Sequence, residues 1–418
     1  MKIAICTIGS RGDIQPFLIL GDYLTKRGHH VRFVSAKMYT SLAGDYQVDF
    51  ESFEGDYELL MDSDEMKKVV GKNPFTIGKV LREKVYPILE NSLDSFLEVS
   101  KWADVVVYHP KALIDAFGYL FPEKLIKAYV LPAFTTTRAF PSPIFSGLWI
   151  PRFLNRFSYW LTKKLMNTVK KPVANFYKKH ELKGKFKFLD STTIYGISPS
   201  FLEQPKDYPD HHSYSGFWLG TAKTSSLDES ITSFLNTDKK KLIITLGSMP
   251  YKSKIDINDF LSACLKELDI KILIVRGWGL KDALIQVNEN ILAIDQAPFE
   301  TLFPLADAVV HHGGAGTTAI TLKAKVPMMI CPILHPVGDQ MFWGKQVHKK
   351  GLGIKPIPLK NLSTKRFVAS IKELMETDFS KTTQKMHTQL QAEDGLQEAA
   401  KLIEAHYKKE VAKKPSKS

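Results

Sequence analysis

The sequence predicts an α/β protein with two doubly wound, Rossmann-like parallel sheets in tandem, facing each other across a cleft. Short β-branched runs alternate with helical patterns along nearly the whole chain, which is typical of parallel sheets covered by helices on both faces. Two series of strands begin alike, because "CTIGS" (6–10) and "TLGS" (245–248) each end an apolar strand in Gly-Ser. Ligands of such sheets bind at the carboxyl ends of the strands, so we expect a site where the two series meet.

Each series supplies its strands in order, with helical stretches between them. The first series is expected at 2–9, 29–36, 104–109, 127–133 and 192–198, with a helix over 15–28 that Gly28 ends. The second series is expected at 240–248, 271–278, 291–296, 308–312 and 327–332. Between them lies "GTAKTSSLDES" (220–230), a polar, turn-rich stretch that is the best linker.

The two series predict an N-terminal domain over 1–222 and a C-terminal domain over 223–392. A length of 418 residues agrees with two or three domains. The last helical stretch, about 393–410, has no strand after it, and we expect it to pack back on the N-terminal domain. Residues 411–418 form a basic tail.

Composition narrows the class of protein. Apolar residues make up 44% and charged residues 24% of the chain, as in ordinary globular proteins. Three scattered cysteines support neither a disulfide framework nor a zinc knuckle. The first apolar run is too short for a signal peptide, and no stretch approaches the roughly 20 apolar residues of a membrane span. We therefore expect a cytoplasmic protein.

The formal net charge of +13 suggests an anionic partner. Nucleic acid, an anionic membrane surface and a phosphorylated small molecule would all suit it. No aromatic RNA-binding run and no zinc-finger pattern is present, so we expect no nucleic-acid partner.

The stretch "HHGGAGTT" (311–318) joins a strand to a helix and suits phosphate binding. A helix N-terminus with its bare N–H groups is a ready anion site, and the glycines let a phosphate approach the backbone. Strand alternation sends His311 and His312 to opposite faces, so that one reaches the ligand while the other packs. The alternative interpretation is a tight turn with two core histidines.

Two further stretches place carboxylates at helix starts. In "HPVGDQMFWGKQV" (335–347), Asp339 and Gln340 form an acceptor and amide pair suited to vicinal hydroxyls, or Asp339 simply caps the helix. In "GSRGDIQP" (9–16), Asp13 is placed either to cap the first helix or to act as a general base at the cleft. Composition alone leaves both questions open.

Other candidate motifs are weak. "DSD" (62–64) lies in an acidic stretch that reads as surface, "GWG" (277–279) lacks the spacing of a dinucleotide fingerprint, and no P-loop sequence is present.

These motifs in this order resemble the sterol- and antibiotic-type glycosyltransferases of family 1. The resemblance rests on "GSRGD", "HHGGAGTT" and "GDQMFWG" and runs from about residue 1 to about 360. Those enzymes have the GT-B fold and move sugar, with inversion, from a nucleotide diphosphate to a lipophilic acceptor. The resemblance implies an acceptor-binding N-terminal domain and a nucleotide-sugar-binding C-terminal domain.

The resemblance also implies roles for individual residues. Asp13 matches the general base, where plant relatives have histidine oriented by an aspartate; His109 stands where that aspartate is expected and receives a supporting role only. Asp339 and Gln340 match the pair that holds the sugar hydroxyls. Gln296 takes the place of a stacking tryptophan, which leaves uracil and thymine open. The residues matched to the diphosphate site are Ser10, Ser248, His311, Gly313, Gly314, Ala315, Gly316 and Thr317.

The acceptor-side segment 133–171 is dense in aromatic residues and cations. We expect Phe140, Phe145, Trp149 and Phe153 to line an apolar acceptor pocket. Because arginines and lysines interleave with them, a second hypothesis makes this segment an interfacial helix on the inner face of a membrane. The alternative is that it merely covers the pocket and the core.

The expected function is inverting transfer of a hexose from a UDP-sugar, UDP-glucose foremost, or a dTDP-sugar to a hydroxyl of a lipophilic acceptor. Sterols, lipids, polyketides and flavonoid-like compounds are the acceptor classes considered. No cofactor or metal is expected, because helix dipole and imidazole stabilise the leaving diphosphate. Epimerisation or hydrolysis of a sugar nucleotide, and non-catalytic binding on the same scaffold, are the competing hypotheses.

Overall fold

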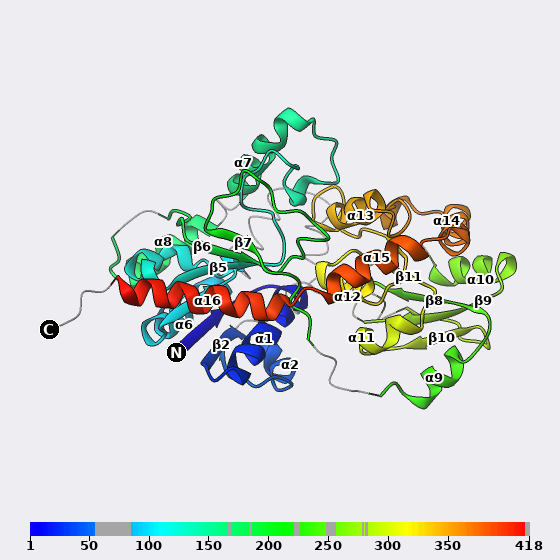
Figure 1. Ribbon diagram of the computed structural model, residues 1–418, viewed down its shortest axis with the longest axis horizontal. Coiled ribbons are helices and arrows are strands. Elements are labelled where there is room, and N and C mark those ends of the chain that lie inside the picture. The colour runs from blue at the N-terminus through cyan, green and yellow to red at the C-terminus, as the bar shows by residue number, and fades with distance from the viewer. Residues whose placement is uncertain are drawn as a thin grey trace.

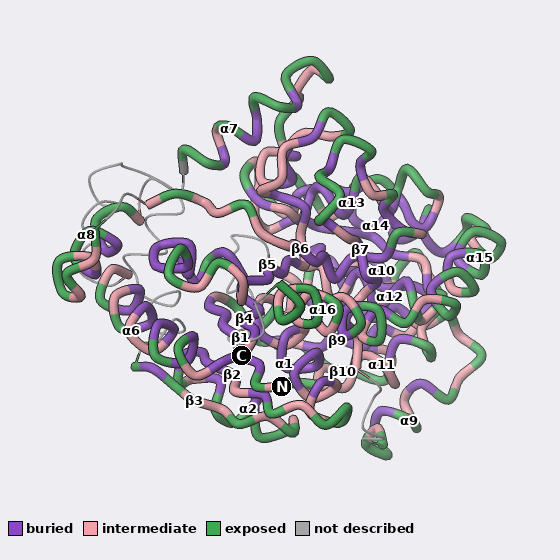
Figure 2. Tube along the Cα trace, turned by 60° about the vertical axis from the view of Figure 1, so that its left-hand side comes forward, coloured by how far each residue is buried: buried purple, intermediate pink, exposed green. Residues whose placement is uncertain are grey.

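The computed structural model describes residues 1–54, 85–165, 169–183, 186–220, 226–247, 256–277, 280 and 283–413. Two parallel sheets lie side by side with helices around them (Figure 1). Buried positions follow the strands of both sheets, while the outer helices carry the exposed ones (Figure 2). The acidic stretch 62–64, Ser248 and the expected domain boundary at 222/223 lie outside the described residues.

The first sheet has the strand order β3-β2-β1-β4-β5-β6-β7, and all its pairs are parallel. Its strands are β1 (Lys2–Cys6), β2 (His30–Ala36), β3 (Asp49–Phe53), β4 (Val105–Tyr108), β5 (Leu125–Tyr129), β6 (Thr192–Tyr195) and β7 (His212–Tyr214). The central strands are mostly apolar because helices cover both faces; every residue of "VVVY" in β4 is buried.

The helices of this half are α1 (Arg11–Lys26), α2 (Thr40–Ala43), α6 (Tyr86–Trp102), α7 (Asn155–Leu165) and α8 (Lys170–Lys179). Helix α1 follows β1 directly, with Ser10 at its N-cap. It buries Ile14, Phe17 and Leu18 at helical spacing. Packing of this apolar face on the sheet fixes the direction in which the first turn of α1 points.

The second sheet has the order β10-β9-β8-β11-β12, again parallel throughout. Its strands are β8 (Lys240–Thr245), β9 (Ile270–Val275), β10 (Ile291–Ile294), β11 (Ala308–His311) and β12 (Met328–Ile330). The helices of this half are α9 (Glu229–Leu235), α10 (Ile257–Glu267), α11 (Phe299–Leu302), α12 (Ala315–Lys323), α13 (Gln340–Lys349), α14 (Thr364–Glu376) and α15 (Ser380–Gln391). The strand order reverses between β1 and β4 in one sheet and between β8 and β11 in the other, which is where ligands bind in such folds. The predicted fold class is confirmed.

A shared apolar cluster holds the two halves together. Tyr195 and Phe201 of the N-terminal half pack in it with Trp343 and Leu390 of the C-terminal half. The rings of Phe201 and Trp343 are stacked, with centroids 6.1 Å apart. The two domains are therefore in contact beside the cleft.

The chain crosses between the domains twice. After α15 it returns to the N-terminal domain as α16 (Gly395–Ala412), which covers the first domain's core with Ala399, Ala400 and Ile403. Arg27 and His29, at the end of α1, each contact the carboxylate of Glu404. The predicted C-terminal helix thus lies on the N-terminal domain, and two residues assigned to the basic tail, 411 and 412, belong to it. None of the helices in the described part of the chain is long and apolar enough to span a bilayer.

Candidate active site

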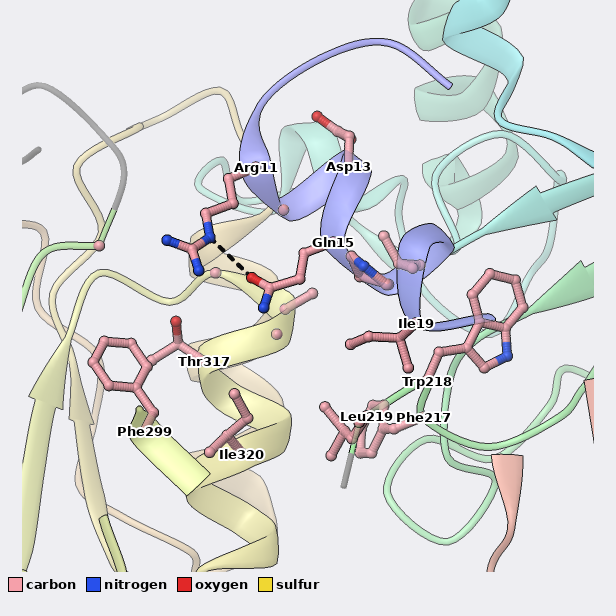
Figure 3. A pocket seen from close by; sticks show the side chains of 18 of the residues that line it. Arg11, Asp13, Gln15, Ile19, Phe217, Trp218, Leu219, Phe299, Thr317 and Ile320 are labelled. Atoms are coloured by element: carbon pink, nitrogen blue, oxygen red, sulfur yellow. Dashed lines mark hydrogen bonds between the residues drawn. The ribbon is translucent and has the colours of Figure 1, made fainter. Parts of the chain in front are cut away.

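A cavity of about 1300 Å³ lies between the domains, at the carboxyl ends of strands from both sheets. The N-terminal domain contributes the first turns of α1 and the ends of β4 and β5. The C-terminal domain contributes the ends of β8 to β11 and the N-termini of α12 and α13. Arg11 and Gln15 on α1 face Thr317 and Ile320 on α12 across this space (Figure 3).

Asp13 lies on the cavity wall and also caps α1. Its Oδ2 accepts hydrogen bonds from the Ser10 backbone N–H at 3.0 Å and from the Ser10 hydroxyl at 3.1 Å. Gly9 has φ +139°, and a Cβ there would lie 2.4 Å from Oδ2, so only glycine leaves room for the carboxylate. Asp13 therefore both caps α1 and lines the cavity.

The second oxygen of Asp13 contacts a cation that was not predicted from the sequence. Lys111 Nζ donates to Asp13 Oδ1 at 2.7 Å, and both residues line the cavity. Burial alone would raise the pKa of Asp13, but the charge of Lys111, aided by His109 and by the hydrogen bonds, holds this pKa below its ordinary value. Asp13 is thus a well-ionised carboxylate. Lys111 stands only two residues after His109, which was a signal in the sequence. Its partner Asp13, however, is 98 positions away, so the pairing could not be predicted.

His109 lies behind this ion pair. Its ring is almost fully buried; Nδ1 accepts the Lys111 backbone N–H at 3.2 Å, and Nε2 lies 4.0 Å from Asp13 Oδ1. Burial lowers the pKa of His109 to about 3, although the charge of Asp13 opposes this. The imidazole is therefore neutral, with its proton on Nε2 toward the carboxylate.

The N-terminus of α12 forms the opposite wall. Gly314 is the N-cap of α12, and Gly314, Ala315, Gly316 and Thr317 all line the cavity. Gly313 does not, because its α-carbon faces the sheet: a Cβ there would lie 2.6 Å from Ile330 Cγ2. Four of the five residues predicted between 313 and 317 therefore line the cavity at the start of α12, where backbone N–H groups have no partner within the helix.

The two histidines of this motif are divided between core and cavity, but in the opposite sense to our prediction. His311 has no exposed surface; its Nδ1 accepts the Gly313 N–H at 3.1 Å and its Nε2 lies 3.3 Å from Met328 Sδ. His312 lines the cavity instead, and its Nδ1 is buried without a hydrogen-bond partner among the described residues. The assignment of His311 to the ligand is wrong, because the last strand residue points into the sheet packing.

Glycines on both sides make the space for His312. A Cβ at Gly314 would lie 2.6 Å from His312 Nε2, and a Cβ at Gly247 would lie 2.5 Å from its Cε1. The imidazole is therefore clamped between two backbone turns at the cavity wall. Burial lowers the pKa of His312 to about 4, so the ring is neutral at pH 7.

Asp339 and Gln340 also line the cavity, next to the α12 turn. Asp339 occupies the N-cap position of α13, yet its side chain makes no capping hydrogen bond. Burial raises the pKa of Asp339, and the nearby charge of Lys111 opposes the rise. Gln340 Oε1 accepts the backbone N–H groups of Ile333 at 2.7 Å and Leu334 at 2.8 Å, which leaves its –NH₂ as the group that can donate to a ligand.

The remaining predicted residues divide into two sets. Ser10 and Gln296 line the cavity. Phe299, which was not among the predicted residues, lines it beside Thr317 and Ile320 (Figure 3). The four predicted acceptor-pocket residues do not line it. Phe140 packs on Phe342 of the C-terminal domain, with ring centroids 5.3 Å apart, and Trp149 and Phe153 are 88% and 84% exposed.

The prediction for Phe140, Phe145, Trp149 and Phe153 is therefore wrong as a description of the cavity wall. Other aromatic and aliphatic residues form its apolar part: Tyr129, Val130, Leu131, Phe134, Ile144, Phe217, Trp218 and Leu219. They come from the end of β5 and the loop after it, from the turn that holds Ile144, and from the crossover after β7.

Two family models match the chain, one in each domain. The model described as the glycosyltransferase family 28 N-terminal domain matches residues 3–108. The model described as the C-terminal domain of erythromycin biosynthesis protein CIII-like proteins matches residues 260–405. The first therefore includes Asp13, and the second includes His312 and Asp339.

Whole-chain relatives agree with these matches. A sterol 3-beta-glucosyltransferase of Arabidopsis thaliana is 29% identical over 98% of this chain and 69% of its own length. One of Candida albicans is 26% identical over 96% of this chain, which spans only about a quarter (27%) of that protein. Among solved structures, the glycosyltransferase of kitacinnamycin has a TM-score of 0.72 at 15% identity, covering 97% of this chain and 99% of that one.

A further solved structure, the glycosyltransferase VinC in complex with dTDP, has a TM-score of 0.67 at 17% identity and covers 98% of this chain and all of its own. At such identity the likeness shows the fold. Together with the family models and the relatives along the whole chain, this likeness leads to the conclusion that the motifs predicted: the chain is a glycosyltransferase of the GT-B fold.

Proposed function

We propose that the protein transfers a hexose, with inversion, from a UDP- or dTDP-sugar to a hydroxyl of a lipophilic acceptor. UDP-glucose is the donor we expect first, because the sterol 3-beta-glucosyltransferases are similar along the whole chain. The observation that carries the proposal is the meeting of two groups in one cavity. An ionised carboxylate, Asp13, and an anion-binding helix start with His312 lie on its opposite walls.

The proposed reaction uses both groups. The acceptor oxygen attacks the anomeric carbon while the bond to the diphosphate breaks, and Asp13 takes the hydroxyl proton. The departing diphosphate gains negative charge, which the N–H groups of α12 and the N–H of His312 stabilise. Asp339 and the Gln340 amide hold the sugar hydroxyls, and the residues around Phe134 and Trp218 receive the apolar acceptor. The glycoside and the nucleoside diphosphate are the products.

Lys111 is assigned a positioning role in this proposal. Its ammonium keeps Asp13 ionised and fixes the oxygen to which the acceptor hydroxyl must bind. The same charge acts on Asp339 across the cavity, so Lys111 connects the base with the sugar side.

Replacement of Lys111 by methionine should move the acid limb of the kcat profile to higher pH. Asp13 must be deprotonated to act, and loss of the ammonium raises its pKa, so activity disappears at a higher pH as the solution is acidified. We expect a displacement of about one pH unit or more, as for carboxylates that lose a neighbouring cation. Lys323→Met, which removes another cavity-lining cation, is the control. An unchanged acid limb in Lys111→Met would contradict the role.

Transfer itself is tested with UDP-glucose and dTDP-glucose, each with and without a sterol in detergent and in the presence of EDTA. Chromatography should show a glycoside and free nucleoside diphosphate only when the acceptor is added, and EDTA should leave the rate unchanged. An altered or released sugar without acceptor would favour an epimerase or hydrolase. Loss of activity in EDTA would contradict the metal-free mechanism. The described residues with metal-ligand spacing, Asp190, His211 and His212, do not line the cavity.

A further inference from the structure

Helix α7 buries a row of polar side chains. Asn155, Ser158 and Thr162 have almost no exposed surface, and they occupy one face at the i, i+3, i+7 spacing. Asn155 Nδ2 donates to the Arg138 carbonyl at 2.8 Å. Ser158 Oγ accepts the Ser142 N–H at 2.7 Å, and the hydroxyls of Ser142 and Thr162 are 2.7 Å apart. A surface helix normally buries an apolar stripe; α7 buries Tyr159 together with these three polar residues and leaves two other aromatic residues, Phe157 and Trp160, at the surface.

The outward side of α7 and the turn before it carry several large apolar side chains. Trp149 and Phe153 are 88% and 84% exposed, and Phe157 and Trp160 are about half exposed (49% and 50%). The rings of Phe157 and Trp160 stack with centroids 5.2 Å apart. With Leu148 and Leu154, also exposed, these residues form what we call the aromatic face. An exposed apolar cluster of this kind marks an interaction site.

The charged residues in the sequence segment of the aromatic face are all cations. Arg152, Arg156, Lys163 and Lys164 are exposed among its residues, and Lys164 Nζ lies 5.0 Å from the Trp160 ring centroid. The sequence has no Asp or Glu between Glu123 and Glu181. Aromatic side chains flanked by arginine and lysine suit the interface of an anionic bilayer. Docking of a second copy through this face would bring like charges together.

The aromatic face begins a few residues after a part of the chain that lines the cavity. Ile144, which lines the cavity, accepts the Gly338 N–H at 2.7 Å, and the Ser146 carbonyl accepts Lys345 Nζ at 2.6 Å. The chain therefore leaves the contact between the domains only a few residues before Trp149. Val337, in the turn that touches Gly147, adds an exposed apolar side chain from the C-terminal domain. Helix α7 stands out from the body beside this junction (Figures 1 and 2).

We propose that the aromatic face docks on an anionic lipid bilayer and holds the cavity mouth at the membrane surface. The aromatic and leucine side chains enter the interface, and the cations bind lipid headgroups. An acceptor dissolved in the bilayer then reaches Ile144 and the apolar wall without crossing water. The docking itself does not depend on the proposed reaction, because it needs neither donor nor acceptor.

The test is sedimentation of the whole protein with vesicles at low salt, without nucleotide or sterol. Vesicles of phosphatidylcholine mixed with phosphatidylserine should bind the protein, and vesicles of phosphatidylcholine alone should bind it less. Trp149→Ser with Phe153→Ser should weaken binding about tenfold or more, because two exposed aromatics leave the interface. Arg152→Gln with Arg156→Gln should remove most of the preference for phosphatidylserine.

Leu284→Ser with Val287→Ser is the matched control, since these side chains are 90% and 59% exposed on the other domain; it should bind like the wild type. All replaced side chains lie at the surface, so the thermal unfolding temperature should stay unchanged. Absence of wild-type sedimentation, or equal binding by the aromatic variant, would overturn the proposal. So would light scattering that shows a dimer of the free protein which the aromatic variant abolishes, because the face would then bind a second copy.

The proposed reaction and the proposed docking can be refuted independently of each other. If transfer to a detergent-dissolved sterol is absent but vesicle binding is present, the reaction is wrong and the docking stands. If the aromatic variant transfers normally in detergent and slowly to a sterol held in vesicles, both stand.

Discussion

Replacement of Asp13 by asparagine is expected to lower kcat by about 10²–10⁴-fold, the usual contribution of a general base. Asparagine keeps an oxygen that can accept from the Ser10 N–H, so the start of α1 should remain capped. It cannot take a proton from the acceptor. The measurement is steady-state transfer, with titration of the nucleoside diphosphate as the binding readout.

Nucleotide affinity should not change in Asp13→Asn, because the carboxylate lies on the wall opposite α12. Asp13→Ala provides a comparison: it should lose the cap as well and be less stable by about 1 kcal/mol. Turnover by Asp13→Asn at the wild-type rate would remove Asp13 from the mechanism, whatever the acceptor.

The second large effect is expected at His312. Replacement by alanine should weaken binding of UDP or dTDP by about 10–100-fold, as for one hydrogen bond to a charged group, worth about 1.5–3 kcal/mol. The reason is the buried ring nitrogen at the cavity wall, which has no hydrogen-bond partner in the described part of the chain. Calorimetric titration in EDTA measures the effect.

His311 offers the paired comparison, because the neighbouring histidine lies in the core. His311→Ala should keep nucleotide affinity and lose roughly 2 kcal/mol or more of folding stability through the cavity it leaves. If that variant fails to fold, His311→Asn keeps an acceptor for the Gly313 N–H. Weaker nucleotide binding in His311→Asn with normal binding in His312→Ala would reverse our assignment.

The strands that build the fold could be predicted because they are continuous apolar runs. Of the strands in the described part of the chain, β3 and β7 were not expected. "DFESF" alternates acidic with aromatic residues at the sheet edge, and "HSY" is only three residues long. Edge strands need less apolar sequence than central ones, since one side of the ladder is open.

The site was harder to predict where direction in space decides the outcome. Alternation along β11 separates His311 from His312, but it does not say which faces the cleft. In segment 133–171, the density of aromatic residues suggested a pocket wall, but density does not say which side chains face the body of the protein. Asn155, Ser158 and Thr162 are buried there, and aromatic residues predicted to line the pocket are exposed. The pairing of Lys111 with Asp13 joins two strand ends that meet only in the folded sheet.

The return of α16 to the first domain has a consequence for synthesis of the chain. Residues up to about 220 leave the ribosome first, yet one side of α1 stays uncovered until Ala399, Ala400 and Ile403 have been made. The C-terminal domain, by contrast, is contiguous and complete before α16 appears. During translation the domain that starts first should therefore finish folding last, and a nascent chain stalled before α16 should expose the apolar side of α1 to chaperones.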